Sequence, residues 1–158
     1  MKRFLMWLGA IGLGLLILVV ALVTVLVVKG RRLDRESKQY ADSAILAIAS
    51  NWNERALLDR ASPEFLKACP AACTDRLFGT ASRLGPLHHY LGSKGQANIS
   101  VLSGRGTLVT AAYVARAAFA HGSAEIRVDI IKRAGRWQII GFHVNLDRMP
   151  PASGPGSA

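Results

Sequence analysis

The residues with the clearest chemical potential are two cysteines, Cys69 and Cys73, which are separated by Pro-Ala-Ala. Soft thiolates suit Cu(I), and a distant histidine would be the third ligand of such a site. The thioredoxin-type redox motif has two intervening residues rather than three. A disulfide closing this short loop would contribute about 2 kcal/mol, and disulfides persist in oxidising compartments. The spacing therefore predicts a disulfide if this part of the chain is exported, with free thiols and a copper site as the alternatives.

Groups suited to acid–base catalysis are few and scattered. An isomerase or dehydratase would need a carboxylate or an Asp–His pair inside a cavity, but Glu125 and Asp129 fall on the solvent face of a predicted strand. His121 falls in a predicted turn, and His143 follows the face of Trp137 and is expected to point inward. The sequence has no Gly-rich phosphate loop, nucleophile elbow or paired-carboxylate motif. We therefore predict a protein that is not an enzyme and has no cofactor or metal.

The element that decides where these residues lie is an uncharged run over residues 4–28. As a helix this run would be roughly 37 Å long, enough for a hydrocarbon layer about 30 Å thick. The apolar part of a cleavable signal peptide is usually about 7–15 residues, so the run predicts an uncleaved transmembrane helix. Within it, Ala10 and Gly14 have the spacing of small residues that permit close helix packing.

Basic residues flank this run on both sides, and the net charge of the chain is +10. A literal count of positive charges would keep the C-terminal side in the cytoplasm. A short basic tip at 1–3 before a long apolar run is, however, typical of a signal anchor, which exports the rest of the chain. We predict a single-pass inner-membrane protein with a periplasmic C-terminal domain. The basic segment 29–33 and the nearby Arg35 are expected to contact anionic lipid headgroups. The side chains concerned are those of Lys29, Arg31, Arg32 and Arg35.

The remaining lysines and arginines are spread singly along the chain, which argues against a nucleic-acid site. After the basic segment, an apolar stripe at helical spacing predicts an amphipathic helix; it is formed by Ala41, Ile45, Ile48 and Trp52. Ser62, Pro63 and Glu64 have the residue types of a helix start, and this short helix must end before Pro70. Thr74 and Asp75 are expected to cap a third helix that continues to Gly85.

The second half of the chain has the alternation of β-strands. Strands are predicted from about 96, over 107–120, over 124–130 and over 136–144, with turns at 103–106, 121–123 and 134–135. Ile126, Val128 and Ile130 would share the buried face of an antiparallel sheet. The Pro-, Gly- and Ser-rich segment 147–158 has no apolar residues to bury and is predicted to be a disordered tail.

The run from Tyr113 to Ile139, which ends in Gly135-Arg-Trp137-Gln-Ile139, resembles the last three strands of the cystatin-like, nuclear-transport-factor-two-like superfold. The likeness covers residues 34–146. It implies a cone with an apolar pocket between helix and sheet, and residues expected to line this pocket are Tyr90, Tyr113, Phe119, Trp137 and His143. Membrane-anchored members include inner-membrane assembly subunits of type IV secretion systems. The chain is also similar, more weakly, to the cytochrome oxidase assembly protein one family.

These observations predict an α+β fold in which an N-terminal transmembrane helix is followed by helices packed on a curved four-stranded antiparallel sheet. The predicted function is that of a non-enzymatic accessory or assembly factor that contacts a membrane protein or a second copy of itself. The alternatives are a module that binds a small apolar ligand in the cone, and copper handling through Cys69 and Cys73.

Overall fold

The computed structural model describes residues 2–102 and 106–146, so the predicted tail at 147–158 and most of the predicted turn at 103–106 lie outside the described residues. The chain divides into two compact units, Met1–Arg35 and Glu36–Ala158, which are considered separately. The helices are α1 (Lys2–Ala49), α2 (Glu54–Leu58), α3 (Pro63–Ala68), α4 (Ala71–Ala81) and the 3₁₀ helix η1 (Ser82–Leu84). The strands are β1 (Leu87–Leu102), β2 (Gly106–Phe119), β3 (Gly122–Arg133) and β4 (Arg136–Leu146).

The first unit consists of the N-terminal part of α1. From Gly14 this helix contains a stretch of mean hydropathy 2.3, which is long and apolar enough to cross a membrane. The large apolar side chains between Leu15 and Val28 that the structure describes are 46% to 65% exposed within the protein. The side chain of Ala10 lies outside the described part, and nothing lies within 4 Å of a Cβ built on Gly14, so their predicted packing role stays a prediction.

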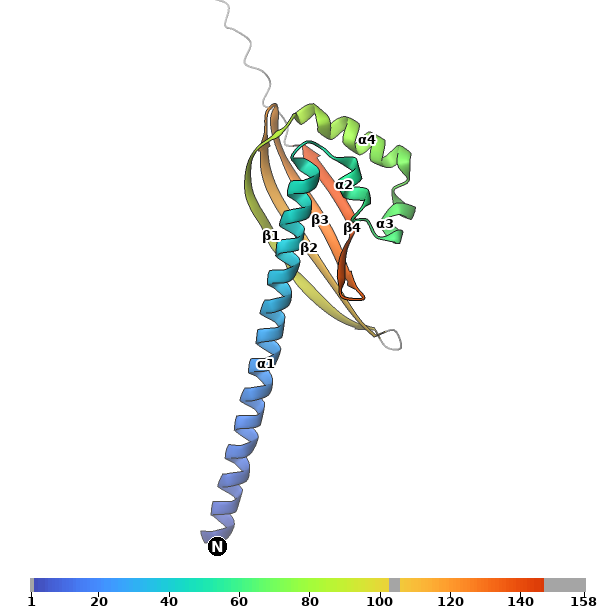
Figure 1. The fold of residues 1–158 in the computed structure, drawn as a ribbon. Helices are drawn as coiled ribbons and strands as arrows, with labels where there is room; N and C mark the ends of the chain where they lie inside the picture. Colours follow the sequence, from blue (N-terminus) through green and yellow to red (C-terminus); the bar gives the residue numbers. More distant parts are fainter. Residues whose placement is uncertain (1, 103–105, 147–158) are drawn as a thin grey trace, which may run out of the picture. The chain divides into compact units, whose positions relative to one another are not determined.

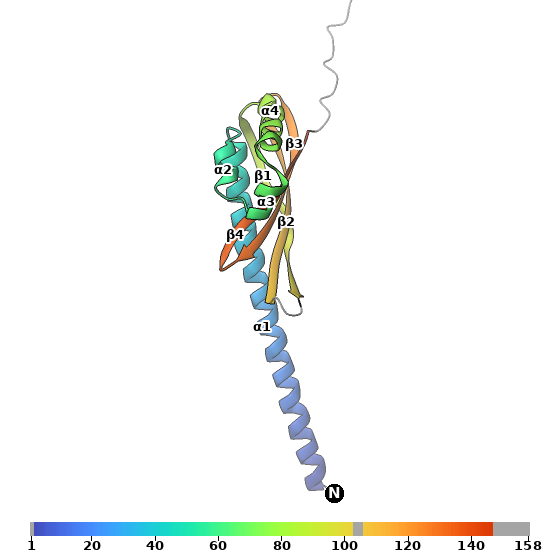
Figure 2. The ribbon, with the colours of Figure 1, turned by 90° about the vertical axis from the view of Figure 1, so that its right-hand side faces the viewer.

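The second unit, which we call the head, is an α+β domain, as the sequence predicts (Figure 1 and Figure 2). Its sheet has the order β1-β2-β3-β4, and every neighbouring pair is antiparallel. The last turns of α1 bury one continuous stripe against this sheet, at the spacing that places side chains on one helix face. The fully buried residues of the stripe are Ala41, Ala44, Ile45, Ile48 and Ala49.

Helix α1 ends in a Schellman motif that has a tryptophan where glycine is usual. The N–H of Asn53 donates to the carbonyl of Ile48 over 2.8 Å, and Trp52 has φ 50°, in the left-handed region that this motif requires. The indole of Trp52 donates to the carbonyl of Gly85 over 3.0 Å and stacks on Phe119 with ring centroids 5.0 Å apart. These contacts offset the cost of a left-handed backbone at a bulky residue.

The start of α3 matches its prediction. Ser62 caps the helix by accepting the N–H of Phe65 over 3.2 Å, and Pro63 is the first helical residue, as both residue types favour. The prediction that Thr74 and Asp75 begin the next helix is wrong, because α4 already begins at Ala71 after Pro70. Proline disfavours helical geometry in the residue before it and not in the residue after it, so the helix restarts directly after Pro70.

The four predicted strands are present, but β1 begins at Leu87, about nine residues before the predicted start. Two irregularities interrupt its pairing with β2, between Leu87 and His89 and between Tyr90 and Ser93. The second irregularity contains Gly92, which has φ 83°, a backbone conformation that suits glycine. Such β-bulges break the period-two pattern on which the sequence prediction depends, so the first half of β1 carried no strand signal.

The inner face of the sheet is formed as predicted, because Ile126, Val128 and Ile130 are fully buried. In β4, however, Ile139 pairs with Ile130 and Gly141 pairs with Asp129, so that Ile140 is an extra residue in a β-bulge. The bulge exchanges the two faces for the rest of the strand. The expectation that His143 points inward is therefore wrong, since His143 is exposed and Phe142 is buried.

Candidate functional site

The residues predicted to line a cone pocket lie in different environments. Tyr113 and Phe119 are 1% and 5% exposed and belong to the packed core between α1 and the sheet. The hydroxyl groups of Tyr113 and Ser37 form a buried hydrogen bond of 2.8 Å, which joins β2 to α1. At these two positions the core is filled by their own aromatic side chains. The structure therefore does not bring the five predicted lining residues together around one cavity.

Trp137 is half-buried at the start of β4. The ammonium group of Lys132 lies 5.4 Å from its ring centroid and also pairs with Glu36 over 2.8 Å; the first distance is within cation–π range. The indole N–H is buried without a hydrogen-bond partner in the described part of the chain. Trp137 lines a cavity of about 490 Å³, whose other lining residues are Tyr40, Asp59, Arg60, Arg136 and Gln138. The mixture of charges around this cavity defines no ligand class.

Tyr90 belongs to a polar cluster that no sequence pattern predicted, which we call the Asp42 cluster: Lys38, Asp42, Tyr90 and Ser93. One carboxylate oxygen of Asp42 accepts the Tyr90 hydroxyl over 2.6 Å and both the hydroxyl and the N–H of Ser93, over 2.6 and 2.9 Å. The other oxygen accepts the ammonium group of Lys38 over 2.7 Å. The bulge at Gly92 places Ser93 where it can form these bonds. The bonds join α1 to β1, about fifty residues later in the sequence, so no local sequence pattern indicates them.

The electrostatics of this cluster describe a satisfied anion. Burial alone would raise the pKa of the Asp42 carboxyl, but the hydrogen bonds from Lys38, Ser93 and Tyr90 outweigh burial and lower that pKa. Burial, together with the carboxylate beside it, raises the pKa of the Tyr90 hydroxyl. Both shifts hold the groups in their hydrogen-bonded forms at neutral pH. The cluster therefore ties β1 to α1 and offers no spare base for catalysis.

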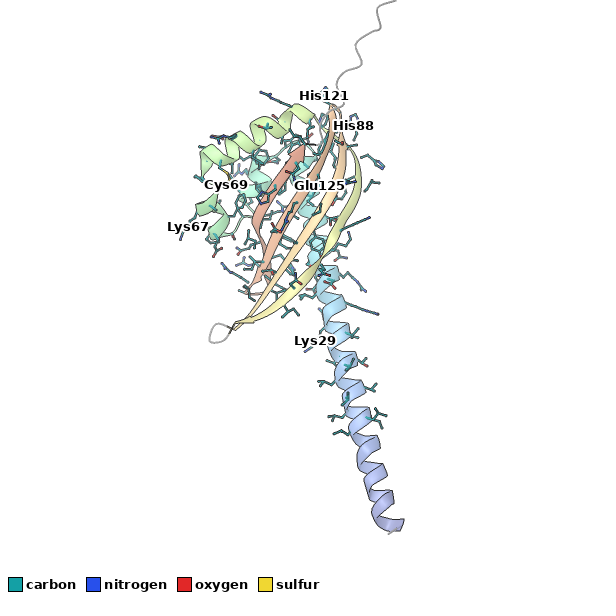
Figure 3. All side chains as sticks on the ribbon, turned by 180° about the vertical axis from the view of Figure 1, so that it is seen from behind. Lys29, Lys67, Cys69, His88, His121 and Glu125 are labelled. Atoms are coloured by element: carbon teal, nitrogen blue, oxygen red, sulfur yellow. A yellow bond between two sulfur atoms is a disulfide. The ribbon has the colours of Figure 1, made fainter. Side chains whose placement is uncertain are left out.

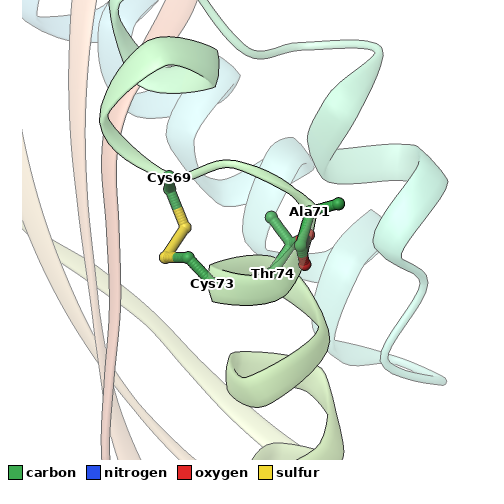
Figure 4. The surroundings of a disulfide bond; sticks show 4 residues. All are labelled: Cys69, Ala71, Cys73 and Thr74. Atoms are coloured by element: carbon green, nitrogen blue, oxygen red, sulfur yellow. Dashed lines mark hydrogen bonds between the residues drawn. A yellow bond between two sulfur atoms is a disulfide. The ribbon is translucent and has the colours of Figure 1, made fainter.

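Cys69 and Cys73 lie at disulfide-bonding distance, with Cα atoms 5.1 Å apart and their sulfur atoms joined (Figure 4). Cys69 is the C-cap residue that directly follows α3, and Cys73 lies in the first turn of α4. The bond therefore fixes the corner between the two helices around Pro70. The hydroxyl of Thr74 donates to the carbonyl of Ala71 over 2.9 Å and closes the same turn.

This corner forms one wall of an apolar cavity of about 510 Å³, which we call the β4 groove. The other wall is formed by residues of the strand β4. Figure 1 shows α3 beside this strand and α4 across the end of the sheet. The residues that line the groove from the helices are Phe65, Ala68, Cys69, Cys73, Arg76, Leu77, Thr80 and Ala81. Those that line it from the strand are Ile140, Gly141, Phe142, His143, Val144 and Leu146. The lining contains the basic residues Arg76 and His143, both exposed, and no Asp or Glu among the described residues. We call these two residues the basic rim of an otherwise largely apolar groove.

The β4 groove runs along an edge of the sheet. At Ile139 this edge is occupied, because the N–H of Ile139 donates to the carbonyl of Arg60 and its own carbonyl accepts the N–H of Ser62, both over 2.8 Å. Along an antiparallel strand, the N–H and C=O groups of successive residues point alternately to one side of the strand and to the other. Ile140 is the extra residue of the bulge and shifts this alternation by one position. The N–H and C=O groups of Phe142, Val144 and Leu146 therefore point away from β3 as well. In the described part of the chain, no strand pairs with β4 on this side beyond Ile139.

The other histidines stand apart from the groove. His88, His89 and His121 are exposed, and His88 and His121 lie at one end of the sheet (Figure 3). His143 and the two cysteines line the same groove, but within the described ranges no group of three His, Cys, Asp or Glu residues is placed to hold a metal ion. Lys29, Arg31, Arg32 and Arg35, the predicted lipid contacts, are exposed on α1.

Neither a protein-family profile, nor a curated protein, nor a solved structure matches this chain. The likeness to the cystatin-like superfold therefore stays a prediction, and the fold is described by its α+β class and strand order. Any inference about function depends on the apolar helix, the disulfide and the β4 groove.

Proposed function

We propose that the chain is a single-pass inner-membrane protein whose head acts in the periplasm as a non-enzymatic accessory or assembly factor, through contacts with other proteins. The observation that carries this proposal is the exposed apolar surface of α1, where side chains such as Leu15 and Leu18 are both 65% exposed. Soluble proteins rarely leave so large a contiguous apolar surface in water. Lipid would cover it, and the head would then be held at a membrane surface.

The disulfide supports the proposed location of the head in the periplasm. Bonds of this kind persist in oxidising compartments and are rare in the cytosol of ordinary bacteria. Cys69 and Cys73 lie at the distance and in the geometry that such a bond needs. Lys2 and Arg3 before the apolar run fit a signal anchor, which keeps this basic segment inside, whereas the larger number of basic residues after the run favours the opposite orientation by count.

Action through protein contacts is supported by how the head uses its polar groups. The best-formed titratable site, the Asp42 cluster, uses its carboxylate for four hydrogen bonds within the protein. The β4 groove, by contrast, is an open apolar surface beside a strand edge. Open surfaces of this kind are common at protein–protein contacts.

A second candidate function is the binding of a small apolar ligand. The volume of the β4 groove is about 510 Å³. Sites for such ligands usually have volumes from roughly 300 to roughly 1000 Å³, so the groove is large enough. The ligand would then occupy the groove rather than the predicted cone, whose aromatic residues are packed in the core. Copper handling is disfavoured as long as Cys69 and Cys73 are bonded to each other.

The proposal is tested by site-specific photo-crosslinking in native membranes, with the photoreactive residue at exposed head positions such as Thr80, Lys67 or Leu91. We expect crosslinks to one membrane or periplasmic protein from some of these positions and not from others. The same protein should co-purify with the full-length chain in mild detergent. Crosslinks to lipids alone, or purification of the chain alone at every detergent tested, would contradict a role in assembly.

A further inference from the structure

We propose that the β4 groove binds an extended segment of a partner protein, which adds to the sheet as a fifth strand and carries alternating apolar residues and a carboxylate. This inference rests on the proposed function and names the surface and the chemistry of the partner. The juxtaposition that carries it is an open strand edge directly beside an apolar wall and a basic rim.

The first requirement is a row of backbone groups that can receive a strand. Phe142, Val144 and Leu146 point their N–H and C=O groups to the free side of β4, as the bonds of Ile139 to Arg60 and Ser62 imply. An added strand would satisfy these groups, as pairing satisfies any open sheet edge. The segment 60–62 already pairs with this edge at Ile139, so the edge accepts extended backbone, and the added strand would begin beyond it.

The second requirement is a surface for the side chains of the added strand. Successive residues of a strand point to opposite faces, so every second side chain would enter the groove. There it would meet Phe65 and Leu77 from the helices and Phe142 and Val144 from β4. The intervening side chains would face solvent. The free edge between Phe142 and Leu146 matches about five residues of partner, or roughly 15 Å of extended chain.

Charge selects among the possible occupants. Arg76 and His143 lie in the lining, which contains no Asp or Glu among its described residues. A second copy of this chain would bring its own β4 to the edge, and β4 contains Arg136 and His143 but no acidic residue. Pairing of two such edges would offer Arg76 no carboxylate from the other copy's β4. It would also bring together two chains that each carry 20 basic and only 10 acidic residues. A separate, acidic and apolar segment fits better.

The disulfide gives the groove a fixed wall. Because Cys69 directly follows α3 and Cys73 lies at the start of α4, the bond limits how far the two helices can move apart at Pro70. A wall that is already in position lowers the ordering cost of binding, which is large for a flexible segment. Reduction should therefore weaken binding without removing any residue from the groove.

The test uses the full-length chain in lipid nanodiscs and a display library of random 12-residue peptides. Selected peptides are synthesised, and their affinities are measured for the wild type and for two groove variants. Thr80→Trp fills the groove from an exposed position on α4, and its matched control is Ser82→Trp in η1, outside the groove. Arg76→Glu reverses the charge of the rim, and its control is Arg83→Glu, also outside the groove.

We expect the peptides to alternate apolar residues with polar ones and to contain Asp or Glu. Thr80→Trp and Arg76→Glu should each weaken binding about tenfold or more, the effect of losing roughly one good contact, whereas the control variants should not. Methylation of alternate peptide amides should abolish binding, and methylation of the intervening amides should have little effect. This dependence with a period of two residues is the signature of an added strand.

Three outcomes would overturn the inference: no peptide that distinguishes wild type from Thr80→Trp, peptides whose binding does not follow the alternate-amide pattern, or dimerisation of the chain through β4. Binding of an apolar small molecule that Thr80→Trp blocks, in the absence of such peptides, would also overturn it. If the crosslinked partner still co-purifies equally with Thr80→Trp, the proposed function stands and the groove is not its contact surface.

Discussion

At the scale of single residues, the head depends on polar groups that are committed to structure. Asp42 lies on α1 and its partners Tyr90 and Ser93 lie on β1, about fifty residues away in the sequence. A carboxylate that accepts several hydrogen bonds is stabilised in its charged form. The cluster therefore couples the docking of α1 to the ionisation of one carboxyl group.

The first prediction concerns the pH dependence of this coupling. The pKa of Asp42 is lowered in the folded protein, so its contribution is present above the ordinary Asp pKa of about 4 and is lost as the pH falls through the lower folded value. The pKa of Tyr90 is raised, which adds a contribution that is present below about pH 10 and is lost as the pH rises through the folded value. Asp42→Asn should lower the free energy of unfolding by about 1–3 kcal/mol at pH 7. The free energy of unfolding of this variant should also fall less steeply at acidic pH than that of the wild type.

The measurement is thermal and urea unfolding of the full-length chain in detergent between pH 2 and pH 11. Asp129→Asn is the control, because Asp129 pairs with Arg127 at the surface and such a pair should contribute less than about 1 kcal/mol. Tyr90→Phe should lose about 1 kcal/mol at neutral pH. Equal effects of Asp42→Asn and Asp129→Asn would contradict the role of the cluster.

The second prediction concerns Gly95, where β1 passes close to β2. A Cβ on Gly95 would lie 1.9 Å from the carbonyl oxygen of Ala112 and 2.8 Å from the ring of Tyr113. Because backbone cannot give way as a flexible side chain can, Gly95→Ala should cost about 3 kcal/mol or more. A Cβ on Gly79 in α4 meets nothing within 4 Å. Gly79→Ala should therefore stabilise by about 0.5–1 kcal/mol. Unfolding midpoints of the two variants, measured side by side, decide this.

At the scale of elements, the disulfide and the tight turns fix how helices and strands follow one another. The turn between β3 and β4 consists of Ala134 and Gly135, both with positive φ, 47° and 79°. This is the conformation of a two-residue hairpin, for which Asn-Gly is the preferred pair. Ala134 is therefore a residue that the turn tolerates rather than favours.

The third prediction is that Ala134→Asn stabilises the head by about 0.5–1 kcal/mol, because asparagine adopts positive φ at lower cost than alanine. A higher unfolding midpoint with an unchanged circular dichroism spectrum would agree with it. Ala134→Val is the contrasting variant, since a β-branched residue disfavours this conformation, and it should destabilise. Stabilisation by both variants would contradict the turn geometry.

The fourth prediction concerns the corner between α3 and α4. The double variant Cys69→Ser, Cys73→Ser should lose about 2 kcal/mol, as expected for a bond that closes so short a loop. The wild type should lose a similar amount in dithiothreitol, whereas the variant should be insensitive to the reductant. Mass spectrometry of the purified chain, with and without alkylation, reports the state of the thiols directly. Full alkylation of untreated protein would contradict a disulfide.

At the scale of the whole molecule, the proposed function places the exposed apolar surface of α1 in lipid, and the compartment of the head would then decide whether the cysteines stay bonded. The fifth prediction is that alkaline phosphatase fused after residue 158 is active, whereas a cytoplasmic fluorescent protein at the same position does not mature. Carbonate washing should leave the chain in the membrane fraction. The reverse reporter pattern would place the head in the cytoplasm and remove the basis for a persistent disulfide.

Sequence patterns predicted those parts of the fold that depend on neighbouring residues. The apolar stripe ending near Trp52, the cap at Ser62 and the alternation around Val128 each follow from a local period or a local bond, and the structure contains each of them. Patterns did not predict α2, a five-residue helix whose start depends on the Asn53 cap. A helix so short has too few turns to show a period.

The candidate site was less predictable than the fold. The β4 groove joins α3 and α4 to a strand about seventy residues later, and the Asp42 cluster depends on an irregularity in β1. To predict such sites, one has to know which distant segments of the chain come into contact, and local patterns in a single sequence do not give this. The predicted cone residues Tyr113 and Phe119 belong to the packed core, because aromatic side chains on an inner face fill space as readily as they line it.

The extra residue at Ile140 makes the second half of β4 sensitive to the number of residues rather than to their identity. Loss of the codon for Ile140 would remove the extra residue and restore an unbroken two-residue period in which Phe142 stays buried and His143 stays exposed. Deletion of His143, after the bulge, would instead place Val144 on the exposed face and Asn145 on the inner face, so it should be far more harmful than deletion of Ile140.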